Sequence, residues 1–382
     1  MVVGNKIELG IIMPVPDIKQ PTLLLDSDRA RRNLQRMVTK AGTNDVLFRP
    51  HFKTHQSQEI GRWFRDSGVT AITVSSLAMA EYFARDDWKD ITVAMPVNLR
   101  EIDRINRLAE NIDLHLLVDS PEAVDFLADH LLWPVAVWIK IDVGYHRCGQ
   151  LWYNTTEIIE LAQKIVAGAN MNFRGILTHA GHTYQQPGPE EVLRIHEEAV
   201  RRLIDLRGDL RQAGIDHCAI SIGDTPGCSL ADNFAGVDEI RPGNFIFNDL
   251  MQWRLGVCSA ADVAVAVVCP VIGKYPKRNE IVIHCGAVHL SKEGLKTDTV
   301  ATVFGYLAPV SENGWGPPHK TAPVIALSQE HGIVQLPPEM MTHVTIGSLV
   351  TILPVHSCLT ANLYSEYLTL DGQPINKMQS LL

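Results

Sequence analysis

A lysine flanked by two histidines, Lys53 between His51 and His55, has the residue types best suited to covalent chemistry in this chain. It follows the short apolar run 46–48, which is typical of a buried strand, and Pro50 marks where such a strand must end. Desolvation and neighbouring positive charges lower the pKa of a lysine amine and leave it nucleophilic enough to form a Schiff base. The alternative is a surface lysine beside two loop histidines, and these residues alone leave both interpretations open.

A second pair of reactive side chains, His356 and Cys358, lies near the end of the sequence. Residues two apart on an extended strand point to the same face, so a strand here would place the imidazole beside the thiol. The two could then share a divalent metal ion, and imidazole with thiolate favours Zn²⁺. A buried cysteine next to an unrelated histidine also explains such a pair, so the spacing by itself does not decide.

The segment 50–55, Pro-His-Phe-Lys-Thr-His, resembles the cofactor-lysine motif of the D-serine dehydratase and D-threonine aldolase group. These are pyridoxal-phosphate (PLP) enzymes with the alanine-racemase-type fold. The resemblance continues, in the order that the family requires, from about Pro21 to Asn362. It implies that Lys53 is a catalytic residue and holds PLP through a Schiff base.

Two glycine-containing segments, 223–226 and 241–244, are similar to the family's phosphate-binding segments. Small residues let backbone N–H groups approach an anion closely, and a short helix after Pro226 would direct its amino terminus at the phosphate. The resemblance implies four residues at the phosphate of the cofactor: Gly223, Thr225, Gly243 and Asn244.

The resemblance assigns three further side chains to the cofactor: Arg147, His179 and Tyr184. Arg147 matches the arginine that hydrogen-bonds the phenolic oxygen of PLP, with a salt bridge at the barrel rim as the alternative. His179 and Tyr184 match residues that face the ring and the substrate. A hydrogen-bonded core histidine is the alternative for His179.

The pair His356 and Cys358 also resembles the metal ligands of the D-serine dehydratase branch, whereas the aldolase branch is expected to have a carboxylate in the second place. Two protein ligands leave positions open for water and a substrate hydroxyl. Zn²⁺ is favoured, and Mn²⁺ or Co²⁺ stays open. One segment departs from the family, because His284-Cys285 stands where Asp-Ala is usual and His289 is additional. This departure leaves the exact substrate open.

The scaffold for these residues is an alternation of strands and helices. Apolar runs predict eight strands, at 46–48, 71–74, 91–94, 114–118, 135–141, 173–177, 218–222 and 239–247. Helices are predicted at 27–40 (closed by Gly42), 56–66, 77–85, 99–109, 121–131, 155–167 and 189–213. This alternation predicts an α/β fold with parallel strands in a (β/α)8 TIM barrel. A doubly wound sheet is the competitor, weakened because no Gly-x-Gly-x-x-Gly follows the first strand.

The sequence changes in character from about Gly256 onward. Strand-like runs at 263–268, 280–284, 299–306, 324–327, 332–336 and 348–354 are separated by turns and little that is helical. They predict a mostly antiparallel β domain. We therefore expect a PLP-binding barrel over residues 21–254 and a β domain, carrying the metal site, from residues 1–20 and 255–382, a division that the family's architecture resembles.

The composition excludes several other classes of protein. The chain has 382 residues, 46% of them hydrophobic, which fits two globular domains. Its net charge of −9 argues against a nucleic-acid partner. Seven cysteines without CxxC spacing fit a reducing cytoplasm, and neither a signal peptide nor a membrane-spanning run is found.

The resemblance implies a PLP- and metal-dependent dehydratase of D-β-hydroxy amino acids, such as D-serine or D-threo-3-hydroxyaspartate, that gives a 2-oxo acid and ammonia. Three alternatives stay open: an aldolase of the D-threonine aldolase type, an amino-acid racemase, and a non-catalytic PLP carrier. A homodimer is expected, again from the resemblance alone.

Overall fold

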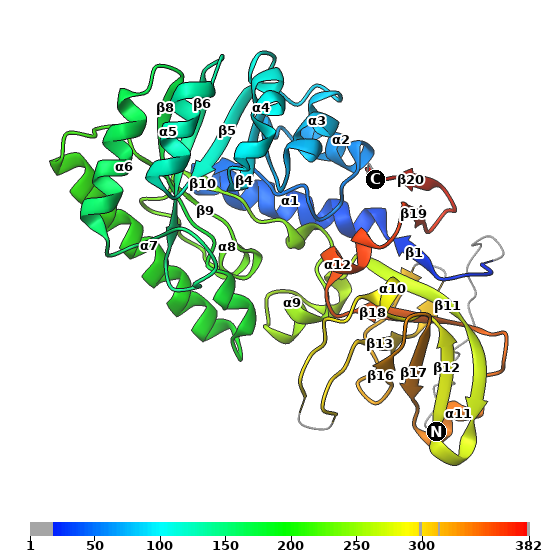
Figure 1. Ribbon diagram of the computed structural model, residues 1–382. Coiled ribbons are helices and arrows are strands. Elements are labelled where there is room, and N and C mark those ends of the chain that lie inside the picture. The colour runs from blue at the N-terminus through cyan, green and yellow to red at the C-terminus, as the bar shows by residue number, and fades with distance from the viewer. Residues whose placement is uncertain (1–17, 298–299, 312–313, 380–382) are drawn as a thin grey trace. The chain divides into compact units, whose positions relative to one another are not determined.

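The chain folds into two compact units in the computed structural model, which describes residues 18–297, 300–311 and 314–379 (Figure 1). One unit is Gln35–Phe245, and the other combines the segments before and after it. Within the described residues, no helix is both long and apolar enough to cross a membrane.

The first unit is a parallel β barrel. Its strands are β2 (Leu47–Phe48), β3 (Ala71–Val74), β4 (Asp90–Pro96), β5 (Asp113–Val118), β6 (Val135–Asp142), β8 (Met171–Leu177), β9 (Ala219–Ile222) and β10 (Glu239–Ile240). They pair in the order β2-β10-β9-β8-β6-β5-β4-β3, and a parallel bridge between His51 and Thr73 joins the two ends. The Phe52 N–H donates to the Thr73 carbonyl at 2.8 Å and the Thr73 N–H to the Pro50 carbonyl at 2.9 Å. This closure confirms the barrel against the doubly wound sheet.

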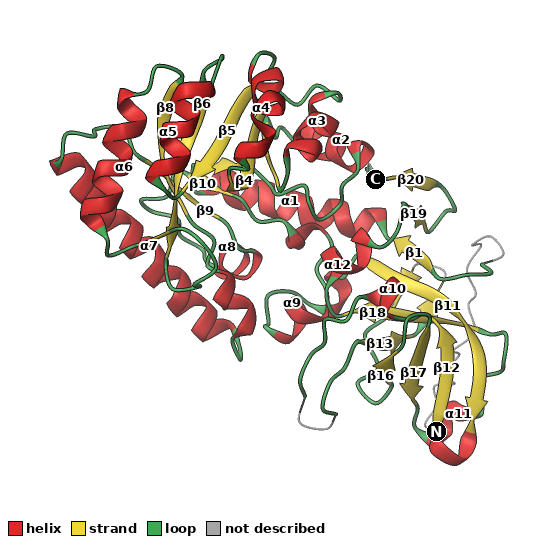
Figure 2. Ribbon diagram, viewed as in Figure 1, coloured by secondary structure: helices red, strands yellow, loops and turns green. Residues whose placement is uncertain are grey.

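Helices connect the strands and lie outside them (Figure 2). Their bounds are α1 Ser27–Thr43, α2 Gln58–Asp66, α3 Leu77–Ala84, α4 Ile102–Ala109, α5 Pro121–His130, α6 Thr155–Ala167, α7 Pro189–Gln212 and α8 Thr225–Leu230. The side chains of Ser57, Ser76 and Ser120 cap α2, α3 and α5 by accepting a backbone N–H. Short 3₁₀ helices lie at Leu99–Glu101, Gly181–Gln185, Asn244–Ile246, Ala260–Asp262 and Pro276–Arg278, and a short strand β7 (Gln150–Leu151) pairs with β6.

Several predicted boundaries are wrong, and two of them have a clear physical cause. The eighth strand, expected over 239–247, stops after two residues, because Pro242 lacks an N–H for the ladder and the chain turns into the 3₁₀ helix Asn244–Ile246. The first helix runs through Gly42 to Thr43. Its direction changes at Asp45, whose φ of 53° is the left-handed conformation expected just after a helix.

The barrel interior holds a buried charge network around Arg49. Its Nε lies 2.5 Å from the Glu239 carboxylate, and its Nη1 pairs with Asp90. Burial alone lowers the pKa of an arginine, but Glu239 and Asp90 outweigh that effect and raise the pKa of Arg49. Ser221 bridges Glu239 to Arg241, its hydroxyl donating to Glu239 at 2.6 Å and accepting from Arg241 Nε at 2.6 Å. The network therefore ties β2, β4, β9 and β10 together.

The second unit is built on a nine-stranded sheet. Its order is β12-β17-β16-β13-β18-β11-β1-β19-β20, antiparallel apart from the pair β1–β19, and β12 also pairs with β11. Bounds are β1 Thr22–Leu25, β11 Val265–Tyr275, β12 Glu280–His284, β13 Gly305–Ala308, β16 Pro323–Leu327, β17 His331–Gln335, β18 Leu349–Pro354, β19 Glu366–Thr369 and β20 Pro374–Asn376. Strands β14 (Val310–Ser311) and β15 (Gly314–Trp315) form a separate pair, and the helices are α9 Leu250–Arg254, α10 Ala287–Leu290, α11 Pro338–Met341 and α12 Ser357–Asn362.

The mostly antiparallel β domain is thus confirmed. The strand at Thr22–Leu25 belongs to its sheet, pairing with β11 through Leu24 and Ala266. The predicted strand at 299–306 is shorter, because pairing begins only at Gly305, and residue 299 lies outside the described residues. The assignment of the PLP site to residues 21–254 and of the metal site to the remainder of the chain stays a prediction.

Replacing Arg49 with Met should lower the free energy of unfolding by about 3–5 kcal/mol, because the buried Glu239 carboxylate loses its partner. Urea unfolding measures this loss. A matched control is Arg62→Met, which breaks an ion pair with Asp86 whose arginine is 55% exposed. The control should cost at most about 1 kcal/mol. Equal losses in the two variants would contradict a special role for the interior pair.

Candidate active site

Lys53 lies just past the carboxyl end of β2, on the turn that follows the closing bridge of the barrel. Its side chain is exposed. The charged groups near the Lys53 amine are positive. The pKa values of His51 and His179 are both held well below the usual value, first by desolvation and then by cations that include Lys53 and Arg147. Both imidazoles are therefore neutral.

His179 is joined to the next strand end. Its Nδ1–H donates to the carbonyl oxygen of Gly223, which leaves the lone pair of the neutral ring on Nε2. Its ring centroid lies 6.2 Å from that of Tyr184 and 6.0 Å from that of Tyr145. The Tyr184 hydroxyl accepts the Thr225 N–H at 3.1 Å, so Tyr184 contacts the segment predicted to bind phosphate.

The two predicted phosphate segments lie against each other and against the lysine turn. A Cβ atom on Gly223 would lie 2.8 Å from the Arg241 Cβ, and one on Gly243 would lie 3.0 Å from the His51 Cβ. Only glycine allows this approach of the chains. Asn244 is buried and begins the 3₁₀ helix that follows Gly243.

The residues at this rim fit PLP. The hydroxyl oxygen of Thr225 is buried and has no hydrogen-bond partner among the described residues, an arrangement that costs free energy unless another group binds there. Asp224 fixes the turn, because its Oδ1 accepts the Gly227 N–H at 2.7 Å and the Thr183 hydroxyl at 3.0 Å. A cofactor with an anionic phosphate and a phenolic oxygen would supply both the missing partner and negative charge beside the cations.

Arg147 stands on a loop shaped by Asp142. One carboxylate oxygen of Asp142 accepts the N–H groups of Gly144, Tyr145 and His146 at 2.8, 2.9 and 3.1 Å. The Arg147 guanidinium is exposed and lies 5.3 Å from the Tyr145 ring centroid. No carboxylate pairs with it in the described parts of the chain, so the alternative of a rim salt bridge finds no support.

Lys140 is a site neighbour that sequence reasoning missed. This residue of β6 is buried, and burial first, with Arg241 and Arg147 among the neighbouring charges, lowers its pKa to about 8. Its Nζ donates to the Ile141 carbonyl at 2.8 Å. A lysine inside an otherwise apolar barrel strand is the sequence signal that identifies it.

The expectation that His356 and Cys358 share a strand is wrong. Strand β18 ends at Pro354, His356 has an extended conformation just before α12, and Cys358 lies in the first turn of that helix. The cause is Asp249, whose Oδ2 accepts the Ser357 N–H at 2.9 Å and so starts the helix. The imidazole and the thiol nevertheless hydrogen-bond each other. The turn from strand to helix brings them together.

The short helix α12 is held at both ends by buried charges. Asp249 holds its amino end and, through Oδ1, also caps α9 by accepting the Gln252 N–H at 2.9 Å. Lys377 holds the carboxyl end, where its Nζ donates to the Ala361 carbonyl and, at 2.9 Å, to the Tyr364 carbonyl. The helix that carries Cys358 is therefore fixed in place by the protein itself.

A third side chain completes the group around His356. Glu293 lies with its Oε2 at 2.6 Å from the Nδ1 of His356. Burial lowers the pKa of His356, but the hydrogen bonds with Cys358 and Glu293 outweigh burial and raise it to about 11. His356 thus contacts both a thiol and a carboxylate, and the imidazole with the thiol is a donor set that fits a divalent metal. No local signal in the sequence points to Glu293, which lies in the segment that departs from the family.

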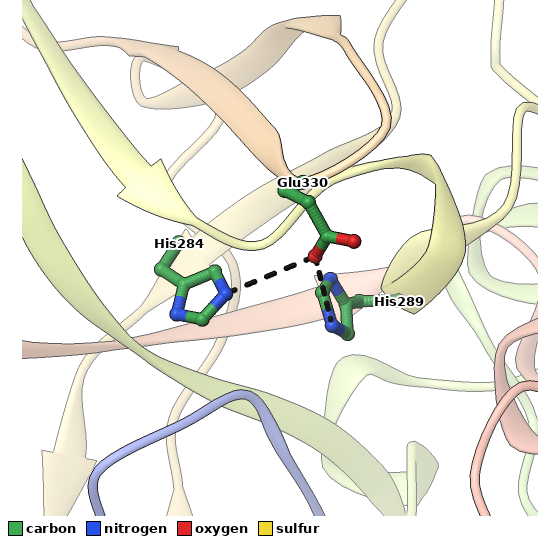
Figure 3. A group of neighbouring side chains, drawn as sticks. All are labelled: His284, His289 and Glu330. Atoms are coloured by element: carbon green, nitrogen blue, oxygen red, sulfur yellow. Dashed lines mark ion pairs between the residues drawn. The ribbon is translucent and has the colours of Figure 1, made fainter.

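Among the described residues, two other clusters each bring three potential metal ligands together. Figure 3 shows His284, His289 and Glu330, with the Nε2 atom of each histidine 3.8 Å from the Glu330 carboxylate. The second cluster, Asp90, Asp113 and His115, belongs to the interior network of the barrel, where the Arg49 guanidinium already neutralises Asp90.

Substituting Asp249 with Ala should lower the free energy of unfolding by about 2–4 kcal/mol, because two helices lose their caps and buried N–H groups lose an acceptor. Chemical denaturation followed by circular dichroism measures the loss. Ser120→Ala removes a single, half-buried cap of α5 and should cost about 1 kcal/mol. A loss no larger than that of the control would contradict the double role of Asp249.

The chain matches two family descriptions. The alanine racemase N-terminal domain matches residues 25–250, and the serine dehydratase domain matches residues 264–370. A PLP cofactor fits the alanine-racemase-like family.

The chain is also similar to named enzymes over nearly its whole length. It is 31% identical to D-serine dehydratase of Dictyostelium discoideum, covering 96% of this chain and 97% of that one. It is 31% identical to D-threo-3-hydroxyaspartate dehydratase of Delftia sp. strain HT23, covering 92% and 94%. A D-threonine aldolase of an Arthrobacter species is 25% identical, covering 92% and 89%.

The solved structure of the Delftia dehydratase superposes with a TM-score of 0.87 at 28% identity, over 95% of this chain and 98% of that one. Other structures of that enzyme include a histidine-to-alanine variant and a cysteine-to-alanine variant in the metal-free form, the two changes lying two positions apart.

Proposed function

The chain belongs to the D-serine dehydratase family of the alanine-racemase-type fold, and we propose that it is a PLP- and metal-dependent dehydratase of D-β-hydroxy amino acids. Substrates of the class of D-serine or D-threo-3-hydroxyaspartate would give a 2-oxo acid and ammonia. The observation that carries the proposal is the thiol of Cys358 in hydrogen-bond contact with His356, in a chain that matches dehydratases over more than nine-tenths of its length.

The barrel residues hold the cofactor and move the substrate's α-proton. Lys53 forms the covalent link, and Arg147 hydrogen-bonds the phenolic oxygen. Gly223, Thr225, Gly243 and Asn244 hold the phosphate, with the hydroxyl of Thr225 supplying a donor that has no partner among the described residues. When bound, PLP supplies an electron sink for the electrons released at the α-carbon. With substrate bound, the Lys53 amine would accept the α-proton.

The neutral state of His179 supports its place beside the ring. A second imidazolium next to Lys53 and Arg147 would add repulsion, and the hydrogen bond from Nδ1 to Gly223 keeps the ring oriented. Tyr184, hydrogen-bonded to the Thr225 N–H, lines the same rim.

His356 and Cys358 hold the metal. A divalent ion there supplies Lewis acidity that makes a substrate β-hydroxyl a better leaving group. Cys358 favours a soft metal, so we propose Zn²⁺ ahead of Mn²⁺ or Co²⁺. The Delftia enzyme supports this site, since a cysteine variant of that protein was solved in a metal-free form.

We also propose that the protein acts as a homodimer in the cytoplasm. The homodimer rests on the resemblance to the family. The cytoplasmic location is supported by the seven cysteines, which form no disulfide bond among the described residues. Analytical ultracentrifugation should give twice the chain mass, and a monomer with full activity would contradict the dimer.

The cofactor assignment predicts a yellow protein whose absorption band disappears on borohydride reduction. Lys53→Ala should lose the covalent link and nearly all activity. Lys164→Ala, at a lysine 43% exposed on α6, serves as the control and should keep both. A wild-type protein that stays colourless when PLP is supplied would refute the cofactor assignment.

The metal assignment predicts that EDTA abolishes elimination from D-serine or D-threo-3-hydroxyaspartate while the PLP absorbance and the melting temperature change little. The open coordination positions are catalytic and the ligands are already fixed by α12, so the fold does not depend on the ion. Zn²⁺ should restore 2-oxo acid formation in the wild type but not in Cys358→Ala.

Product analysis separates this proposal from its competitors. Glycine and an aldehyde from D-threonine would indicate aldolase chemistry, and L-serine formed from D-serine would indicate a racemase. Full dehydratase activity after chelation, or a neutral Cys358→Ala, would refute the metal site.

A further inference from the structure

We infer that Glu293 is the positioning residue that sets His356 for metal binding: its carboxylate accepts a hydrogen bond from the Nδ1–H of His356 and leaves Nε2 as the nitrogen that faces the metal. This inference rests on the proposed metal site and adds the residue that orients one of its two ligands.

The contact itself fixes the tautomer. An ionised carboxylate only accepts hydrogen bonds, so Nδ1–H must be the donor across the 2.6 Å between Nδ1 and the Glu293 Oε2. That separation is in the short range of charge-assisted bonds. When the ring gives up one proton to bind a metal, the hydrogen bond to Glu293 keeps the remaining proton on Nδ1, so the lone pair for the metal lies on Nε2, and the bond also raises the basicity of the ring as a ligand.

Both partners are held by the same small region of backbone. Glu293 follows the end of α10, where its N–H donates to the Ser291 hydroxyl at 3.2 Å. At the end of α10, the Leu290 carbonyl accepts a hydrogen bond from the hydroxyl of Thr360 at 3.1 Å. Thr360 belongs to α12, the helix of Cys358. The carboxylate and the two proposed ligands are therefore tied together before any ion arrives, as a preorganised site requires.

The neighbouring cluster of His284, His289 and Glu330 shows the opposite arrangement (Figure 3). There the Gly286 N–H donates to the Nδ1 of His289 at 3.1 Å, so the lone pair of that ring is used on Nδ1. The proton of neutral His289 then lies on Nε2, on the side of the Glu330 carboxylate 3.8 Å away. This histidine is set to donate to a carboxylate, whereas His356 is set to bind a metal through Nε2.

The contrast supplies a matched control. Glu293 and Glu330 both pair with a histidine in the same unit, and their side chains are 37% and 47% exposed. Zn²⁺ affinity would be measured on EDTA-treated, PLP-loaded protein by competition with a chromophoric chelator. Glu293→Ala should weaken binding about 10–100-fold, since loss of such an outer partner has this effect in metalloproteins. Glu330→Gln should bind Zn²⁺ as the wild type does.

The conservative variant tests orientation against mere support of the fold. Glu293→Gln keeps an oxygen that can accept from Nδ1, so it should recover part of the affinity lost in Glu293→Ala. The metal-free melting temperatures and the PLP absorbance should match among the three variants. Wild-type affinity in Glu293→Ala, no recovery in Glu293→Gln, or an equal loss in Glu330→Gln would overturn the inference. Failure of the proposed metal site is a different result, in which the wild type and Cys358→Ala bind Zn²⁺ equally weakly.

Discussion

The first unit depends on one short piece of backbone pairing, the bridge between His51 and Thr73 that closes the barrel. Two N–H···O bonds, from Phe52 to Thr73 and from Thr73 to Pro50, join the last strand to the first. Because all eight strands are parallel, closure brings their carboxyl ends to one rim. Lys53 follows the bridge by two residues, so its position at that rim is a consequence of closing the barrel rather than of any local preference.

Charge explains what that rim can hold. Lys53, Arg147, Lys140 and Arg241 act together on two histidines, which stay neutral because another positive charge there would be repelled and poorly solvated. Arg49 and Arg241 are paired with Glu239 and Asp90, so these carboxylates are already neutralised by buried arginines. An anionic cofactor supplies that charge. The glycines at this rim have a steric reason. At Gly223 and Gly243, any side chain would meet neighbouring backbone or side chains.

Features that depend on residues close in sequence could be predicted from the sequence, whereas features that depend on residues far apart in sequence could not. The barrel strands were predictable because buried parallel strands are continuous apolar runs, and the serine caps of α2, α3 and α5 are local signals. The conformation of His356 and Cys358 was not, because helix α12 begins where Asp249, 108 positions earlier, accepts the Ser357 N–H. Glu293, 63 positions from His356, was missed for a similar reason. Its role is defined by a neighbour distant in sequence.

The second unit shows why residue type alone does not identify a metal ligand. His289 and His356 both stand within reach of a glutamate, and a count of histidines and carboxylates would rank the three-residue cluster with His289 ahead of the pair with Cys358. The group that is hydrogen-bonded to Nδ1 of each histidine reverses that ranking in favour of His356. A backbone N–H on Nδ1 places the ring's proton on Nε2, whereas a carboxylate on Nδ1 draws the proton there and frees Nε2. Since α12 is held by Asp249 and Lys377 independently of any ion, the imidazole and the thiol keep their relation in the metal-free protein. Because the protein already holds both ligands in place, folding does not depend on the metal. The ion's remaining coordination positions are then available to substrate.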